Sequence, residues 1–177
     1  MKKLLFSALA GAVATGVGAA GSATSLVQMD LQSIVSDASV IVVATAMDRE
    51  YVQTEEGVHT ITTFDVSDTV LGAEQETLRV SVPGGVRRIG KFKVAETWAG
   101  APLFLRGSEA LMFLTDRGDG DYRVVGFSQG SAPVHETIEG KMVQLPGDNA
   151  GPMQLGEAIG EIMKAADSAQ GTSLSLE

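Results

Sequence analysis

Short strands separated by turn residues recur through most of this 177-residue chain, and that pattern limits its fold more than any other feature. Residues 78–82 alternate apolar and polar side chains, which is typical of a half-buried strand. Residues 40–46 and 110–114 are apolar on both faces, which predicts strands covered on both sides. Because the intervening turns are too short for crossover helices, we predict antiparallel pairing.

Apolar residues spaced three and four apart, the pattern of a helix, occur in two segments, one near the N-terminus and one near the C-terminus. Asp30 precedes apolar residues at helical intervals, so we predict a short helix over 31–37. Apolar side chains three and four residues apart predict one amphipathic helix over 152–167. The predicted fold is therefore mainly β, a small antiparallel, OB-like barrel with a short N-terminal helix and a C-terminal amphipathic helix. A β-sandwich is the alternative.

The N-terminal residues 1–23 have the pattern of a secretory signal peptide: Lys2 and Lys3, a short apolar stretch and then small residues. This predicts an exported protein, periplasmic or extracellular, with no transmembrane segment in the mature chain. The mature chain is expected to form one β-rich domain over 24–168, followed by a disordered tail over 169–177. Of 13 basic residues two lie in the leader, so 11 remain against 22 acidic residues, a net charge of −11. We expect no nucleic-acid partner, since phosphates would be repelled.

Few residues are suited to catalysis or to holding a metal. The chain has no cysteine and two histidines, so we expect no metal site and no cofactor. Residues 126–130 match G-x-S-x-G, the nucleophile motif of α/β hydrolases, with Ser128 and His135 as the candidate catalytic pair. That motif needs a following helix, whereas the residues after it are typical of a strand. We interpret the segment as a hairpin or bulge and keep a small serine hydrolase as an alternative function.

Basic residues gather in one segment of an otherwise acidic chain. Arg87, Arg88, Lys91 and Lys93 lie within seven positions, just after the strand break at 83–85. They are the candidate ligand-binding residues, suited to an acidic protein or an anionic ligand. The competing interpretation is an exposed edge strand whose lysines block unwanted pairing.

We therefore predict an exported, non-enzymatic binding or interaction module. A structural component of the envelope or of an extracellular matrix is the other alternative. The ligand and the oligomeric state do not follow from the sequence.

A resemblance extends over roughly residues 24–145. The chain is similar to a group of uncharacterised bacterial exported proteins in the segments 38–45, 62–66, 70–72, 78–85, 100–104, 107–114 and 125–130. More distantly, the strand order resembles the OB barrel of netrin-like domains and tissue-metalloproteinase inhibitors. That likeness implies a five-stranded barrel used for binding. The inhibitors act through an N-terminal cysteine, which this chain lacks, so their mechanism is not implied.

Overall fold

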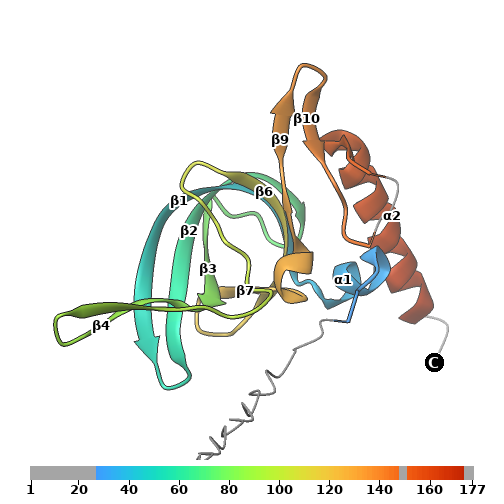
Figure 1. Ribbon diagram of the computed structural model, residues 1–177. Helices are drawn as coiled ribbons and strands as arrows, with labels where there is room; N and C mark the ends of the chain where they lie inside the picture. Colours follow the sequence, from blue (N-terminus) through green and yellow to red (C-terminus); the bar gives the residue numbers. More distant parts are fainter. Residues whose placement is uncertain (1–26, 148–150, 174–177) are drawn as a thin grey trace, which may run out of the picture.

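In the computed structural model, which describes residues 27–147 and 151–173, five strands close into a ring (Figure 1). The ring strands are β1 (Val40–Thr54), β2 (Gly57–Leu71), β3 (Thr77–Pro83), β6 (Glu109–Asp116) and β7 (Tyr122–Val124). Their order is β1-β2-β3-β7-β6, and β6 returns to pair with β1. This closed, OB-like ring confirms the predicted mainly β fold, and the alternative sandwich of two packed sheets does not form.

One pair in the ring departs from the antiparallel prediction. Strands β3 and β7 run parallel and meet only at Val80 and Tyr122. The sequence contains no sign of this pair, because the parallel strands are separated by the whole of β4, β5 and β6. No second residue pair joins these two strands in the described part of the chain.

Residues 40–46 of β1 and 110–114 of β6 are buried on both faces, as their sequences predict, whereas the rest of β1 is mostly exposed. Val42 and Leu114 are fully buried and belong to the cluster inside the ring, together with Phe64, whose ring meets Phe104 edge-on at 4.9 Å. Ile41 and Phe113 point the other way, into a second cluster that includes side chains from both helices. The two helices therefore cover the outer face of β1 and β6.

Helix α1 (Leu31–Asp37) is capped as predicted. The Asp30 carboxylate accepts a hydrogen bond of 2.8 Å from the Ser33 backbone N–H. Hydrogen bonding from the Ser33 side chain first, and from its backbone second, holds the pKa of Asp30 below its usual value. Ile34 and Val35 bury the apolar side of the helix. The cap therefore sets where α1 begins against the ring.

Helix α2 spans Leu155–Ser173, not the predicted 152–167. It starts later because Met153 and Gln154 form strand β11 (Met153–Gln154), which pairs with β10 (Gly140–Val143). It ends later because residues 168–173 continue the helix, and 169–173 of these belong to the tail that is expected to be disordered. Residues 1–23, the predicted leader, and 174–177 lie outside the described residues.

The remaining elements are short. A 3-10 turn, η1 (Phe127–Gly130), follows β7, and β8 (Ser131–Pro133) then pairs with β6. β9 (His135–Thr137) pairs with β10 in the last hairpin of the described chain. Strands β4 (Gly85–Ile89) and β5 (Phe92–Glu96) make a separate two-stranded hairpin. Among the described residues, no helix has the length and apolar character to cross a membrane.

Candidate functional site

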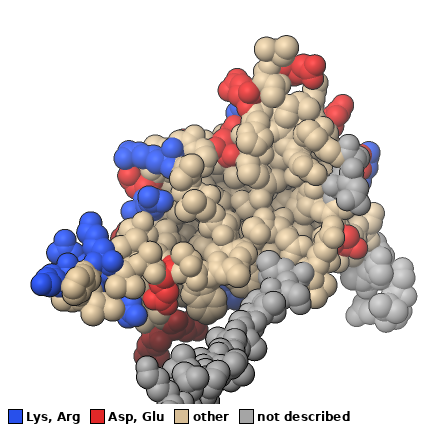
Figure 2. Space-filling view, viewed as in Figure 1, with Lys and Arg blue, Asp and Glu red and all other residues tan. Residues whose placement is uncertain are grey.

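The four predicted ligand-binding residues lie together on the β4–β5 hairpin, called here the arm (Gly85–Glu96). The arm projects from the ring at the left of Figure 1. In the space-filling view its end carries the main cluster of basic side chains on this face (Figure 2). Arg87, Arg88, Lys91 and Lys93 are all exposed. The sequence cluster is therefore also a cluster in space.

A tight two-residue turn forms the tip of the arm. Gly90 has φ +60°, as a hairpin turn with glycine at its first central position requires, and Ile89 pairs with Phe92 across it. Phe92 is 65% exposed and Ile89 50% exposed, and the Lys91 ammonium lies 5.7 Å from the centre of the Phe92 ring. The tip therefore presents two apolar side chains and a cation to solvent.

The charges on the arm are mostly uncompensated. Arg87 pairs weakly with Glu96, Nε to Oε2 at 3.6 Å. Arg88, Lys91 and Lys93 have no ion-pair partner in the described part of the chain. Arg88 and Lys93 lie directly opposite each other, an arrangement that destabilises a hairpin. An arm that only guarded an edge would not need this unfavourable pair.

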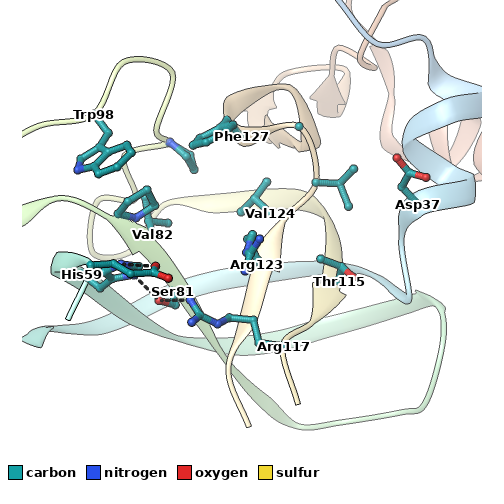
Figure 3. A pocket seen from close by; sticks show the side chains of 15 residues that line it. Asp37, His59, Ser81, Val82, Trp98, Thr115, Arg117, Arg123, Val124 and Phe127 are labelled. Carbon is teal, nitrogen blue, oxygen red and sulfur yellow. Dashed lines mark hydrogen bonds and ion pairs between the residues drawn. The ribbon is translucent and has the colours of Figure 1, made fainter. Parts of the chain in front are cut away.

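A second candidate site is a cleft of about 620 Å³, called here the ring cleft, which lies beside β3 and β7 (Figure 3). Its walls include Trp98, Pro102 and Phe127, and its polar side includes His59, Ser81 and Arg117. Trp98 is 49% exposed and Phe127 39%. Sequence reasoning missed this site because its residues come from β2, β3, the 97–108 loop and the β6–β7 turn.

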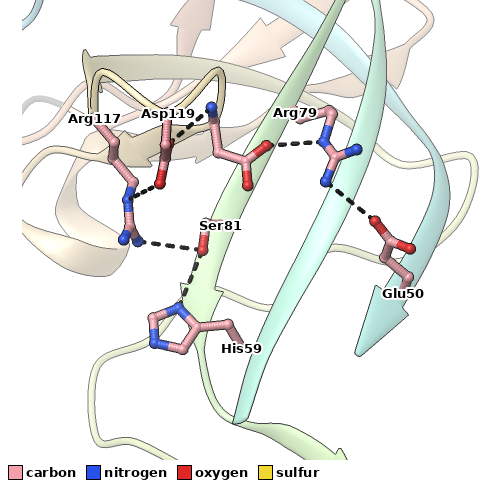
Figure 4. Close-up of polar contacts among 7 residues, drawn as sticks. Glu50, His59, Arg79, Ser81, Arg117 and Asp119 are labelled. Carbon is pink, nitrogen blue, oxygen red and sulfur yellow. Dashed lines mark hydrogen bonds and ion pairs between the residues drawn. The ribbon is translucent and has the colours of Figure 1, made fainter. Parts of the chain in front are cut away.

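Ser81 links the polar side chains of the ring cleft (Figure 4). Its Oγ lies 3.1 Å from His59 Nδ1, and Arg117 Nη1 donates to the same oxygen at 3.4 Å. His59 and Ser81 are both buried. The other ring nitrogen of His59 lies 4.0 Å from Glu56, a carboxylate that is 81% exposed. These contacts orient the Arg117 side chain along the outside of β3.

The β6–β7 turn supports Arg117 from the other side. Asp119 Oδ2 lies 3.3 Å from Arg117 Nε, but the buried Nε–H is not directed at the carboxylate and makes no hydrogen bond. Asp119 Oδ1 accepts the Asp121 backbone N–H, and Asp121 in turn binds Arg79 at 2.8 Å. The acidic turn therefore holds Arg117, and its carboxylates are occupied by turn and ion-pair contacts.

Ser128 and His135 are not brought together as a catalytic pair. Both are exposed, and no hydrogen bond joins them within the described residues. The Ser128 backbone N–H instead donates to the Gly100 carbonyl at 2.9 Å. The left-handed residue is Phe127, not the serine, and a strand follows where the hydrolase motif needs a helix. The geometry therefore does not support the hydrolase alternative at this position.

The comparisons and the metal-binding geometry add no assignment. The chain matches no protein-family model, and a search of curated proteins finds no similar sequence. Within residues 27–147 and 151–173, no group of three or more histidine, aspartate or glutamate side chains is placed to hold a metal ion.

Proposed function

We propose that this protein is an exported binding module, and that the arm is the element that contacts its ligand, an anionic lipid surface. The observation that carries the proposal is the tip, where exposed apolar side chains stand beside cations that no described acidic group neutralises. Apolar residues flanked by lysine and arginine suit the boundary between lipid headgroups and acyl chains.

The projection of the arm explains how an acidic protein could approach an anionic surface. The mature chain is expected to carry a net charge of −11, which opposes any approach to a negative surface. Strands rise about 3.3 Å per residue, so the five residues of β4 extend roughly 16 Å. That length is about two Debye lengths at physiological ionic strength, roughly 8 Å each. The tip cations can therefore meet the surface while repulsion from the body is screened.

The size of the tip favours lipid over a protein partner. A stable protein interface buries about 800 Å² on each side, more than two apolar side chains and a few cations supply. A lipid surface needs less, because each lysine or arginine near it contributes about 1 kcal/mol. We therefore expect weak, reversible membrane contact that salt diminishes.

Vesicle sedimentation tests the proposal. The protein should bind phosphatidylglycerol vesicles at 10 mM salt, bind them weakly at 150 mM, and not bind phosphatidylcholine vesicles. The double reversal Arg88→Glu/Lys93→Glu should abolish binding with an unchanged circular dichroism spectrum. The matched control is Arg106→Glu/Lys164→Glu, which changes the net charge equally at two exposed positions outside the arm.

Two results would contradict the lipid proposal. The first is equal binding by the reversed arm and the wild type. The second is no vesicle binding together with salt-sensitive binding to immobilised poly-glutamate that the arm reversal abolishes. The second result would assign the arm to acidic protein surfaces.

A further inference from the structure

Beyond the role of the arm, we propose that the ring cleft binds an amphipathic organic carboxylate. Its apolar body lies between Trp98 and Phe127, and its carboxylate meets Arg117 beside Ser81. The inference rests on the shape of the cleft, on the state of the arginine and on a strained aromatic residue.

The dimensions and walls of the cleft suit a small organic molecule. A volume of about 620 Å³ lies within the usual range for ligand pockets, roughly 300–1,000 Å³. Such pockets combine mostly apolar walls with a few convergent polar groups. The labelled side chains of Figure 3 follow this division, with Trp98 and Phe127 at one side and Arg117, Ser81 and His59 at the other. An amphipathic ligand matches both sides.

The Arg117 side chain is held in place, but its guanidinium group does not use all of its hydrogen-bond donors. Nη1 donates to Ser81 Oγ, while Nε is buried without a hydrogen bond and Nη2 contacts no acceptor among the described residues. Guanidinium groups prefer carboxylates with two parallel hydrogen bonds. The side chain is fixed by Asp119 and Ser81 before any ligand arrives, so little freedom remains to be lost on binding.

The other charged groups that line the cleft do not oppose the binding of a carboxylate to Arg117. Arg123 also lines the cleft, has no ion-pair partner in the described ranges and adds positive charge. Glu56 and Asp37 line it too, but both are exposed, so water and salt screen them. Arg117, whose side chain is 24% exposed, is therefore the most buried charged group of the cleft, and Asp119 at 3.3 Å offsets part of its charge.

Phe127 provides an independent sign of a binding site. Its φ of +58° makes it the one non-glycine residue in the left-handed region within the described chain. A bulky side chain is seldom found there, and such strain clusters at ligand sites. The turn around it is tight, since a Cβ on the preceding Gly126 would lie 2.7 Å from Met29 Sδ. This unfavourable backbone places the phenyl ring on the wall of the cleft, opposite the polar side.

The fluorescence of Trp98, the only tryptophan in the sequence, offers a direct test. We would titrate the protein with 4-phenylbutyrate and with its neutral analogue 4-phenylbutanamide. Saturable fluorescence change with the carboxylate, and at least tenfold weaker affinity for the amide, is the expected result. Arg117→Met should reduce the preference for the carboxylate to less than threefold, whereas Arg106→Met, which removes an exposed arginine elsewhere, should leave it unchanged.

A folding defect is distinguished by a second variant. If Arg117→Met does not fold, Ser81→Ala, which removes one contact of the guanidinium and leaves the arginine, should weaken carboxylate binding by threefold to tenfold. Equal affinity for acid and amide, or an unchanged preference in Arg117→Met, would overturn the proposal. Stoichiometric labelling of Ser81 by a fluorophosphonate, lost in His59→Ala, would also overturn it, since the cleft would then be a catalytic site.

Discussion

The ring, apart from its parallel β3–β7 pair, and the arm are both built from antiparallel strands, yet they differ in how much of each strand is buried. β1 and β6 bury side chains on both faces, against the ring interior and against the two helices. β4 and β5 carry mostly exposed side chains and pair chiefly with each other. Packing therefore restricts which side chains the buried strands of the ring can carry, whereas it restricts those of the arm very little. Charges and aromatic groups on the arm need an explanation other than folding.

The sharpest test of this contrast compares two phenylalanines. Phe113 in β6 is 0% exposed and Phe92 in β5 is 65% exposed. Phe113→Ala should lower the free energy of unfolding by about 3–5 kcal/mol, because it leaves a cavity between β6 and the helices. Phe92→Ala should change it by less than about 0.5 kcal/mol, as at an ordinary surface position. Chemical denaturation measures both, and similar losses would show that the arm belongs to the core.

The next test concerns the base of the arm. Gly84 has φ +102°, and a Cβ there would lie 2.8 Å from the Glu96 carbonyl oxygen. Gly140 has φ +109° with nothing within 4 Å, so it is the matched control. Both alanine variants incur left-handed strain, but only Gly84→Ala adds a backbone clash. We expect Gly84→Ala to cost about 1–3 kcal/mol more than Gly140→Ala, and equal costs would mean that the arm tolerates displacement.

A smaller effect, of opposite sign, is expected from the facing cations of the arm. Arg88→Thr removes the like-charge pair with Lys93, so it should raise the free energy of unfolding by about 0.2–1 kcal/mol at low salt. In 1 M salt, where the Debye length is about 3 Å, the gain should vanish. Thermal unfolding at the two salt concentrations measures this. If Arg88→Thr is more stable than the wild type and also binds vesicles less tightly, then Arg88 serves binding at a cost to folding stability.

The smallest effect concerns the cap of α1. The pKa of Asp30 lies below its usual 3.8 in the folded protein, because the carboxylate is hydrogen-bonded by the side chain and then by the backbone N–H of Ser33. A lowered folded pKa contributes stability above 3.8 that is lost as the pH falls through the folded value. Asp30→Asn retains a capping oxygen that does not titrate. Relative to this variant, the wild type should lose stability between pH 5 and pH 2, while vesicle binding by the arm stays the same in both at neutral pH.

Much of the ring could be predicted from its residues, because burial imposes a readable pattern. The two-sided apolar runs at 40–46 and 110–114 identify β1 and β6, and alternation at 78–82 identifies β3. The basic cluster was also visible, since it is contiguous in the sequence. The hairpin form of the arm was missed because its β4 half, with two arginines between Val86 and Ile89, lacks the apolar alternation of a strand.

The ring cleft could not be predicted for a different reason. Ser81 and His59 meet through the β2–β3 register, and Arg117 reaches them because β6 and β7 close the ring beside β3. Each residue taken alone is an ordinary strand or turn residue. Phe127 gives no sequence sign of its left-handed backbone, because phenylalanine is unusual in that conformation.

The two ends of the arm lie side by side, since Gly85, which follows β3, pairs with Glu96, which precedes the 97–108 loop. Because its ends are adjacent, the arm could be replaced by a tight turn of a few residues. The path of β3 and of the loop that follows the arm would stay the same. The length, charge and tip residues of the arm can therefore change without altering the pairing of the ring strands. The ring can be inherited as a constant frame, and the same junction is the natural place to graft a different recognition hairpin.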